Sequence, residues 1–318
     1  MSAERPNFRL GIVLLAYHRP RQLAELVRAL SHARVTVYLH IDSAADLGPF
    51  RRALAQSGTP ELVWLRRYRS AWGSLAIVDA ELEGIRRALS DGCSYVAVIS
   101  GEDFPLRPVE EIVEFLHANQ ARSFLETASL PCADWPYEGR ARTDFYSYRL
   151  FGKHYSCVPM GEHTAEMPAA RRLLNWGLRA RFMFAPQRQF PDYLRPYGGQ
   201  QWLNISAAAA RQIIDFTDRH PDYRSYHIHT ACPDEIFIQS ILLGTDFARR
   251  HEVVNDDLRF LIWTGGDHPK TLGLADLPAM LDSADLFARK VVAEVDPELL
   301  EALLERSGVH PSSKTIAS

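Results

Sequence analysis

The chain has 318 residues, of which 47% are hydrophobic and 24% are charged, and its formal net charge is −3. Such a chain can bury a full core as one large domain or two small ones, which excludes a disordered or fibrous protein. The slightly acidic balance argues against a protein that works mainly through contacts with nucleic-acid phosphates, so we expect no nucleic-acid partner.

The first predicted element is a buried strand at Leu10–Ala16. This stretch is a continuous apolar run, which is typical of a strand that is covered on both faces of a sheet. The run ends at Tyr17, so it is too short to span a membrane, and it lacks a small-residue cleavage site. We therefore expect no transmembrane segment and a cytoplasmic protein.

A helix and a second strand follow. Apolar residues recur at helical spacing within Gln22–His32, and Val35–Ile41 is again an apolar run. Strand, helix and strand in this order form a βαβ unit, which predicts a parallel sheet. Further strands are expected at Glu61–Leu65, Tyr95–Ser100, Ser123–Glu126, Leu203–Ser206 and Leu258–Trp263, and helices at Leu75–Leu89, Glu110–His117, Ala207–Arg219, Leu277–Leu281 and Pro297–Arg306. The sequence therefore predicts an α/β fold with a mainly parallel central sheet flanked by helices.

Polar residues follow two of these strands. Asp42 comes directly after the second strand, and Ser100–Leu106 follows the strand at Tyr95–Ser100. In open α/β sheets the ligand lies beyond the carboxyl ends of the strands, so we expect these residues to line one crevice. The alternative for an acid in this position is a role in forming the turn.

The periodic spacing of apolar residues weakens between Cys132 and Tyr197, where aromatic residues, prolines and arginines are mixed. An irregular stretch of this length in a compact chain indicates either a functional region or elements that the pattern does not reveal. Its aromatic residues would suit a surface for stacking a sugar. For each of them, a place in the core is the alternative.

A candidate catalytic segment is Pro233-Asp234-Glu235, which is followed by an apolar run. Proline at a first helical position predicts that a helix begins here. One explanation of two acids in a first turn is that their charges stabilise the helix by interacting with its dipole. The functional alternative is that Glu235 points into a cleft as a general base.

The motifs of several enzyme classes are missing from the sequence. It contains no phosphate-binding P-loop, no dinucleotide-binding glycine motif, no nucleophile elbow and no His-Glu-x-x-His. Its four cysteines are widely spaced and indicate neither a zinc site nor a disulfide framework. It also contains no Asp-x-Asp, the acid pair through which metal-dependent sugar transferases hold a diphosphate. If the substrate is a sugar nucleotide, something other than a metal ion must neutralise the leaving group.

From about Ile12 to Leu303, the chain resembles the core 2 and I-branching β-1,6-N-acetylglucosaminyltransferases and the related peptide O-xylosyltransferases. The order and spacing of several motifs carry this resemblance: Ile12–His18, His40-Ile41-Asp42, Ser70-Ala71-Trp72, SGEDFPL at Ser100–Leu106, GGQQWLNIS at Gly198–Ser206, Pro233-Asp234-Glu235, His268-Pro269-Lys270 and Phe287-Ala288-Arg289-Lys290.

The resemblance implies a GT-A-type fold and an inverting, metal-independent transfer from a UDP-sugar to a hydroxyl of a glycan acceptor. Glu235 would be the general base, while Lys270 and Lys290 would bind the diphosphate, with Arg289 as a second candidate. Lys270 stands where some relatives have arginine, so a point charge replaces a two-pronged donor. The other donor-binding residues would be Ala16, Asp42 and Asp103, and the acceptor-binding residues would be Glu102, Trp202 and Asp234.

The resemblance also implies one catalytic domain at residues 1–308, with a nucleotide-binding half at about 10–125 and an acceptor-binding and catalytic half at 126–308. A disordered tail is expected at 309–318. UDP-GlcNAc is favoured as the donor, and UDP-xylose remains open. No cofactor or metal ion is expected.

The chain departs from the animal enzymes of the family, which carry an N-terminal anchor and disulfides. We therefore interpret it as a bacterial-type enzyme of polysaccharide biosynthesis, with peripheral association with an assembly system as one option. Two alternatives stay open, namely a non-catalytic protein that binds a sugar nucleotide or carbohydrate, and a metal-dependent transferase. For the lysines, the alternative is that they are solvated surface charges.

Overall fold

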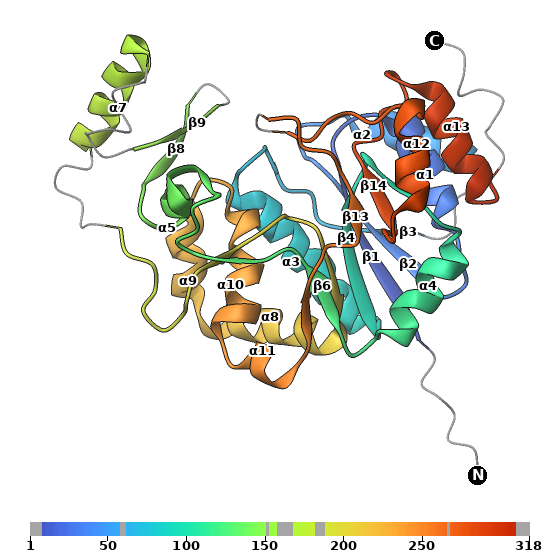
Figure 1. Ribbon diagram of the computed structural model, residues 1–318, viewed down its shortest axis with the longest axis horizontal. Coiled ribbons are helices and arrows are strands. Elements are labelled where there is room, and N and C mark those ends of the chain that lie inside the picture. Colours follow the sequence, from blue (N-terminus) through green and yellow to red (C-terminus); the bar gives the residue numbers. More distant parts are fainter. Residues whose placement is uncertain are drawn as a thin grey trace.

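The computed structural model in Figure 1 describes residues 8–57, 62–150, 153–157, 168–181, 188–265 and 268–309. In this part of the chain, the central sheet has the strand order β12-β6-β11-β4-β1-β2-β3. Its strands are β1 (Leu10–Ala16), β2 (Val35–Ile41), β3 (Leu62–Trp64), β4 (Tyr95–Ser100), β6 (Ser123–Leu125), β11 (Leu203–Ser206) and β12 (Val253–Asn255).

The sheet is mostly parallel, as the sequence predicts. Strand β1 pairs in parallel with both β2 and β4, β2 with β3, and β12 with β6. Strand β11 runs antiparallel to its neighbours β4 and β6. The register pairs Ala16 with Ile41 and Leu15 with Ser100, so the carboxyl ends of β1, β2 and β4 lie at one edge.

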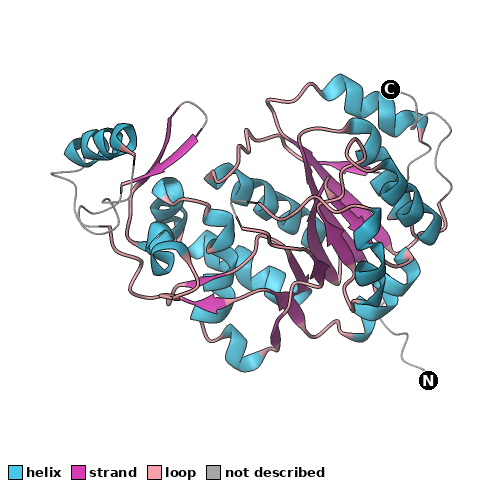
Figure 2. Ribbon diagram, turned by 45° about the horizontal axis from the view of Figure 1, so that its top comes forward, coloured by secondary structure: helices cyan, strands magenta, loops and turns pink. Residues whose placement is uncertain are grey.

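Helices cover both faces of the sheet, as Figures 1 and 2 show. One layer contains α1 (Pro20–Ala29), α2 (Leu47–Gln56), α4 (Val109–Ala118), α12 (Leu277–Asp282) and α13 (Pro297–Arg306). The other contains α3 (Leu75–Ser90), α8 (Ala207–Arg219) and α10 (Phe237–Gly244), with the short helices α9 (Pro221–Tyr226) and α11 (Phe247–Arg250) beside them.

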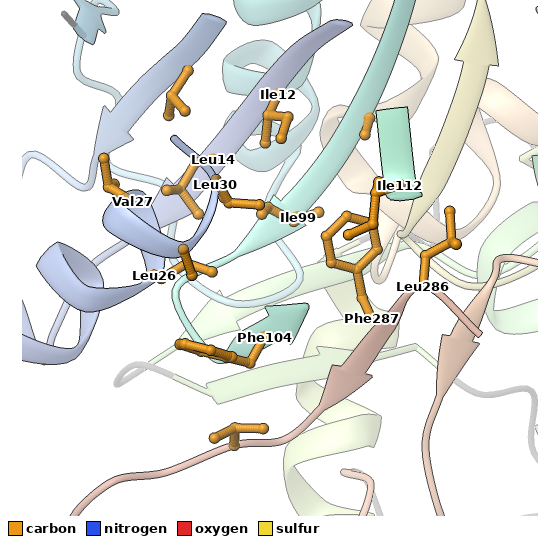
Figure 3. Packing of buried hydrophobic residues seen from close by; sticks show 14 of the residues in the cluster. Ile12, Leu14, Leu26, Val27, Leu30, Ile99, Phe104, Ile112, Leu286 and Phe287 are labelled. Atoms are coloured by element: carbon orange, nitrogen blue, oxygen red, sulfur yellow. The ribbon is translucent and has the colours of Figure 1, made fainter. Parts of the chain in front are cut away.

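Alternating side chains of the central strand supply both cores. Ile12 and Leu14 point into the first core, where Figure 3 shows them near Leu26 of α1 and Leu30, the residue after that helix, while Val13 belongs to the second core. All of them are fully buried. Burying each such side chain contributes about 1.5–3 kcal/mol to the free energy of folding. The apolar run of β1 therefore stabilises both cores.

A second, small sheet lies beside the end of β4. It has the order β13-β14-β5 and consists of β13 (Arg259–Phe260), β14 (Phe287–Arg289) and β5 (Asp103–Pro105). Strand β14 runs antiparallel to β5, with Arg289 paired to Asp103. The late Phe-Ala-Arg-Lys segment is thereby brought to the loop after β4.

An arm extends from the body on the side of α9 and α10 (Figure 1). It follows a 3-10 turn at Pro136–Gly139 and the helix α5 (Arg140–Thr143), and contains the hairpin β8 (Ser147–Leu150) and β9 (Lys153–Ser156) and the helix α7 (Ala169–Arg181). The chain returns through β10 (Tyr197–Gly198), which pairs with β7 (Ala128–Ser129). The irregular region between Cys132 and Tyr197 therefore contains elements that its pattern does not reveal.

Several predicted elements have different bounds in the structure. The strand expected at Leu258–Trp263 is reduced to β13, and Asp103–Pro105, expected in a loop, forms β5. The helix expected from Pro233 begins as a 3-10 turn at Pro233–Glu235, and α10 starts after a break at Ile236. Of the tail predicted at 309–318, residues 310–318 lie outside the described residues. Within the described part of the chain, no helix combines the length and apolar character that a membrane crossing needs.

Candidate active site

The candidate site begins at the carboxyl ends of β1, β2 and β4. The backbone N–H of Asp42 donates to the carbonyl of Ala16 over 2.9 Å, and that of Gly101 donates to the carbonyl of Leu15 over 3.0 Å. The predicted donor-binding residues Ala16 and Asp42 and the loop after β4 are therefore neighbours. This is the sheet edge at which α/β proteins bind ligands.

The carboxylate of Asp42 is buried and already bonded. Its Oδ1 accepts a hydrogen bond from the backbone N–H of Ala44 over 2.7 Å, and its Oδ2 accepts one from the hydroxyl of Ser70 over 2.9 Å. Both the turn-forming role and the donor-binding role fit this geometry. Ser70 belongs to the Ser-Ala-Trp motif, so two of the recognised motifs meet here.

Glu102 is the centre of a cluster of basic groups. One of its oxygens lies 2.6 Å from Nη1 of Arg19 and 3.1 Å from Nε2 of His18, and the other lies 3.3 Å from Nζ of Lys290. Its side chain is only 8% exposed. Burial alone would raise the pKa of Glu102, but the hydrogen bond from His18 and the charges of Lys290 and Arg289 outweigh it and lower the pKa to about 2.

Asp103 is part of a buried ion pair next to this cluster. Its Oδ1 lies 2.6 Å from Nε of Arg259, and both side chains are fully buried. Its Oδ2 accepts hydrogen bonds from the backbone N–H and the hydroxyl of Ser100 and lies 3.4 Å from Nη1 of Arg289. Asp103 therefore fixes Arg289 and the loop from beneath, and Arg259 is a partner that the sequence pattern does not indicate.

Trp202, a predicted acceptor-binding residue, is buried below the same cations. The guanidinium of Arg289 lies 4.3 Å from the centre of its ring, and that of Arg259 lies 5.1 Å away. Cations at this distance are attracted by the face of an indole ring. In this structure, Trp202 supports Arg289 from within the protein.

Lys270 and Lys290 lie on neighbouring backbone segments. The N–H of Leu272 donates to the carbonyl of Lys290 over 2.9 Å. The side chains differ in their surroundings, because Lys290 faces Glu102 with 18% exposure, whereas Lys270 is 42% exposed and bonded to Asp276 over 2.7 Å. The alternative of a solvated surface charge therefore fits Lys270 better than Lys290.

Glu235 lines a pocket of about 310 Å³. The pocket walls combine indole rings, carboxylates and polar backbone, and the residues are Glu126, Asp134, Trp135, Pro136, Arg142, Gly199, Gln200, Glu235 and Trp263. Glu235 itself is 30% exposed, so its carboxylate is both held by the protein and accessible from the pocket. Its backbone carbonyl accepts a 2.9 Å hydrogen bond from the N–H of Gly199.

Arg142 of α5 is the partner of Glu235. Its Nε and Nη2 donate to Oε2 of Glu235 over 3.1 Å and 2.5 Å. Burial alone would lower the pKa of Arg142, but the charge of Glu235 outweighs it and raises the pKa. The sequence gives no signal for this pair, because Arg142 is 93 residues away and lies in the region without periodicity.

Two further carboxyl groups lie behind Glu235. Burial, and then the charge of Glu235, raises the pKa of Asp234 to about 7. Glu81 of α3 is fully enclosed and accepts a 2.8 Å hydrogen bond from Gln201, and burial together with the charge of Asp234 raises its pKa well above the ordinary value. Of Asp234 and Glu235, Glu235 is the acid that faces the pocket.

Short stretches of chain connect the pocket with the cation cluster. Gly199 bonds to Glu235, and three residues later Trp202 packs against Arg289. On the other side, Trp263 lines the pocket while the carbonyl of its neighbour Ile262 accepts a hydrogen bond from the N–H of Lys270. Each of the two segments thus runs from the pocket that Glu235 lines to one of the cation candidates.

The described residues contain no group of three or more His, Cys, Asp or Glu side chains that could hold a metal ion. The metal independence that the resemblance implies stays a prediction.

Comparison with known proteins gives a consistent result for most of the chain. Residues 13–285 match the family described as Core-2/I-Branching enzyme. Xylosyltransferase 2 of Homo sapiens is 23% identical over 322 residues, covering 94% of this chain and 33% of that protein. Xylosyltransferase oxt of Drosophila pseudoobscura pseudoobscura is 28% identical over 255 residues, covering 76% and 25%.

The chain spans between a quarter and a third of the length of these curated relatives. Among solved structures, S. aureus TarS matches with a TM-score of 0.29 and 10% identity, covering 41% of this chain and 23% of that one.

Proposed function

The chain belongs to the Core-2/I-Branching enzyme family, and on this premise we propose that it is an inverting glycosyltransferase of GT-A type. It moves a sugar from a UDP-sugar to a hydroxyl of a glycan acceptor, and the transfer needs no metal ion. The single observation that carries the proposal is the position of Glu235, which is accessible from a pocket and held by Arg142.

Glu235 acts as the general base. A hydroxyl is a weak nucleophile, and a carboxylate within hydrogen-bond reach that takes its proton accelerates the attack by about 10²–10⁴. The hydroxyl oxygen then attacks the anomeric carbon from the face opposite the UDP, so the configuration at that carbon is inverted. Arg142 holds one carboxylate oxygen, which leaves Oε1 to receive the proton.

Lys290, with Arg289 and Lys270, binds the diphosphate. Cations that are already in place stabilise the charge that develops on the leaving UDP without further reorganisation. Glu102 forms an ion pair with Lys290, and Asp276 forms one with Lys270. Donor binding exchanges these carboxylates for phosphate oxygens, and Asp42 faces the uridine at the ends of β1 and β2.

The pocket beside Glu235 receives the acceptor. Two indole rings, Trp135 and Trp263, and the carboxylates of Glu126 and Asp134 line it. Aromatic faces with a few polar groups are typical of sites for small polar-apolar ligands such as a sugar ring. For the donor, the resemblance favours UDP-GlcNAc, whereas the two named relatives are xylosyltransferases, so UDP-xylose is tested on an equal footing.

The test is calorimetric titration with UDP, UDP-GlcNAc and UDP-xylose in excess EDTA, for the wild type and for Lys270→Ala/Lys290→Ala. We expect one sugar nucleotide to bind without metal and the double variant to lose that binding. The same samples are then assayed for transfer and hydrolysis. Binding that requires Mn²⁺ or Mg²⁺ would contradict the proposal, and binding without any turnover would support the non-catalytic alternative.

A further inference from the structure

Helix α7 stands apart from the two cores. It lies at the end of the arm, beyond the hairpin of β8 and β9, in both views of the molecule (Figures 1 and 2). The arm is rooted beside the pocket, because α5, which carries Arg142, precedes β8 directly. Arg188, where the described chain resumes, donates to the backbone carbonyl of Arg142 over 3.1 Å.

One face of α7 is an unpartnered apolar stripe. Ala169, Leu173, Trp176 and Ala180 follow one another at intervals of four, three and four, which places them on one side of a helix. All four are exposed, and Leu173 and Trp176 have 69% and 63% of their surface open to solvent. The opposite side turns inward, since Asn175 is 4% exposed.

The same helix is strongly basic. The stretch Ala169–Arg181 contains four arginines and no acidic residue. Arg172 lies one turn before Trp176 and therefore beside the stripe, whereas Arg171 lies one turn before Asn175, on the other side of the helix. Arg172 is exposed, and within the described part of the chain it has no ion pair. A helix with an apolar stripe, a tryptophan in it and arginine beside it is typical of helices that lie in a membrane interface.

The size of the stripe decides against a second copy of the chain as its occupant. One leucine and one tryptophan offer roughly 300 Å² of apolar surface, whereas a stable protein interface buries about 800 Å² on each partner. A membrane needs no matching surface of this size, because lipid headgroups add an electrostatic attraction of their own. Anionic headgroups also complement the arginines.

We propose that α7 is a peripheral membrane anchor, whose stripe at Leu173 and Trp176 inserts among the headgroups of an anionic lipid surface while the arginines bind the lipid phosphates. The long arginine stems reach past the apolar boundary and keep their charges in the headgroup layer. Docking in this way holds the arm, and the pocket at its root, next to the membrane. This inference does not depend on the proposed transfer reaction.

The test is flotation with vesicles of phosphatidylcholine alone and with about one third phosphatidylglycerol, in about 0.1 M salt. We expect the wild type to bind the anionic vesicles and Leu173→Gln/Trp176→Gln to bind them about tenfold less. Arg172→Gln should weaken binding to the anionic vesicles in the same direction. The matched controls change exposed residues elsewhere, Ile228→Gln/Leu281→Gln for the apolar pair and Arg250→Gln for the arginine, and should bind like the wild type.

Three outcomes would overturn the proposal. They are no binding of the wild type to anionic vesicles, binding that persists in Leu173→Gln/Trp176→Gln, and lipid-free self-association in sedimentation velocity that the same variant abolishes. Urea unfolding of this variant shows whether it is folded like the wild type. UDP titration separates the two proposals, because the donor binding of the variant should match that of the wild type whatever the vesicles show.

Discussion

Arg142 and Glu235 form an ion pair in which both hydrogen bonds are accepted by the same carboxylate oxygen. The donors are Nε and Nη2 of Arg142, at 3.1 Å and 2.5 Å, and the acceptor of both is Oε2 of Glu235. Two charge-assisted bonds that converge on one oxygen hold that oxygen in place. Helix α5, from which the arm extends, therefore takes part in positioning the proposed base.

The first prediction concerns this pair. Arg142→Gln should lower kcat for transfer by about 10- to 100-fold, because Glu235 loses the bonds that orient it and a small misplacement of a catalytic group is costly. The matched control is Arg140→Gln on the same helix, whose partner is Asp144 at the surface, and it should keep a wild-type kcat. Equal losses in both variants would mean that α5 matters for folding alone.

The second prediction concerns the two lysines. Lys290→Met should weaken UDP binding about tenfold or more in EDTA, and Lys270→Met should act in the same direction with a smaller effect, because its side chain is the more exposed of the two. Calorimetry with uridine provides the control, since a ligand without phosphates should bind all three proteins alike. A uridine affinity that falls together with the UDP affinity would place the lysines away from the diphosphate.

Glu102 leads to a prediction about pH and stability. Its pKa is lowered from 4.5 to about 2 in the folded protein, so its carboxylate stabilises the fold above its ordinary pKa, and that stabilisation is lost as the pH falls from about 4.5 towards 2. The shift corresponds to roughly 3 kcal/mol at neutral pH.

Urea unfolding measures this effect in the wild type and in Glu102→Gln. The variant should be less stable by a few kcal/mol at about pH 7, and the difference should shrink as the pH is lowered to about 3. A difference that does not change with pH would show that the loss comes from packing and not from the charge of Glu102.

Arg259 and Asp103 give a prediction about stability alone. Both side chains are fully buried, and the atoms Nε and Oδ1 are 2.6 Å apart. Arg259→Met removes the nearer of the two cations from the Asp103 carboxylate and leaves Arg289 at 3.4 Å, so it should cost about 3–5 kcal/mol of unfolding free energy. The surface pair of Arg86 and Asp218 is the control, because both its side chains are about half exposed, and Arg86→Met should cost under about 1 kcal/mol. Similar costs for the two variants would contradict the account of the buried pair.

The fold could be predicted where the residues of an element themselves determine its bounds. Strands β1, β2 and β4 have the predicted bounds, because a strand buried on both faces must be a continuous apolar run. Helices α8 and α13 also have the predicted bounds. Their starts are marked by Ser206 and Asp296, whose side chains accept hydrogen bonds from Ala209 and Leu299.

Elements that depend on distant partners could not be predicted. Strands β5 and β14 have three residues each and exist because they pair with each other from opposite ends of the chain. The same holds for the site. Position after a strand predicts that Asp42 and Glu102 lie at one edge, whereas the contacts of Arg142 with Glu235 and of Arg259 with Asp103 join segments that the sequence pattern does not link.

The most direct test of the central claim is the transfer rate of Glu235→Gln at saturating donor and acceptor. The substitution keeps the size of the side chain and removes its ability to take a proton, so we expect kcat to fall by about 10²–10⁴ while the affinity for UDP stays within about twofold of the wild type. A variant that binds UDP normally and keeps more than about a tenth of the wild-type kcat would contradict the assignment of Glu235 as the general base.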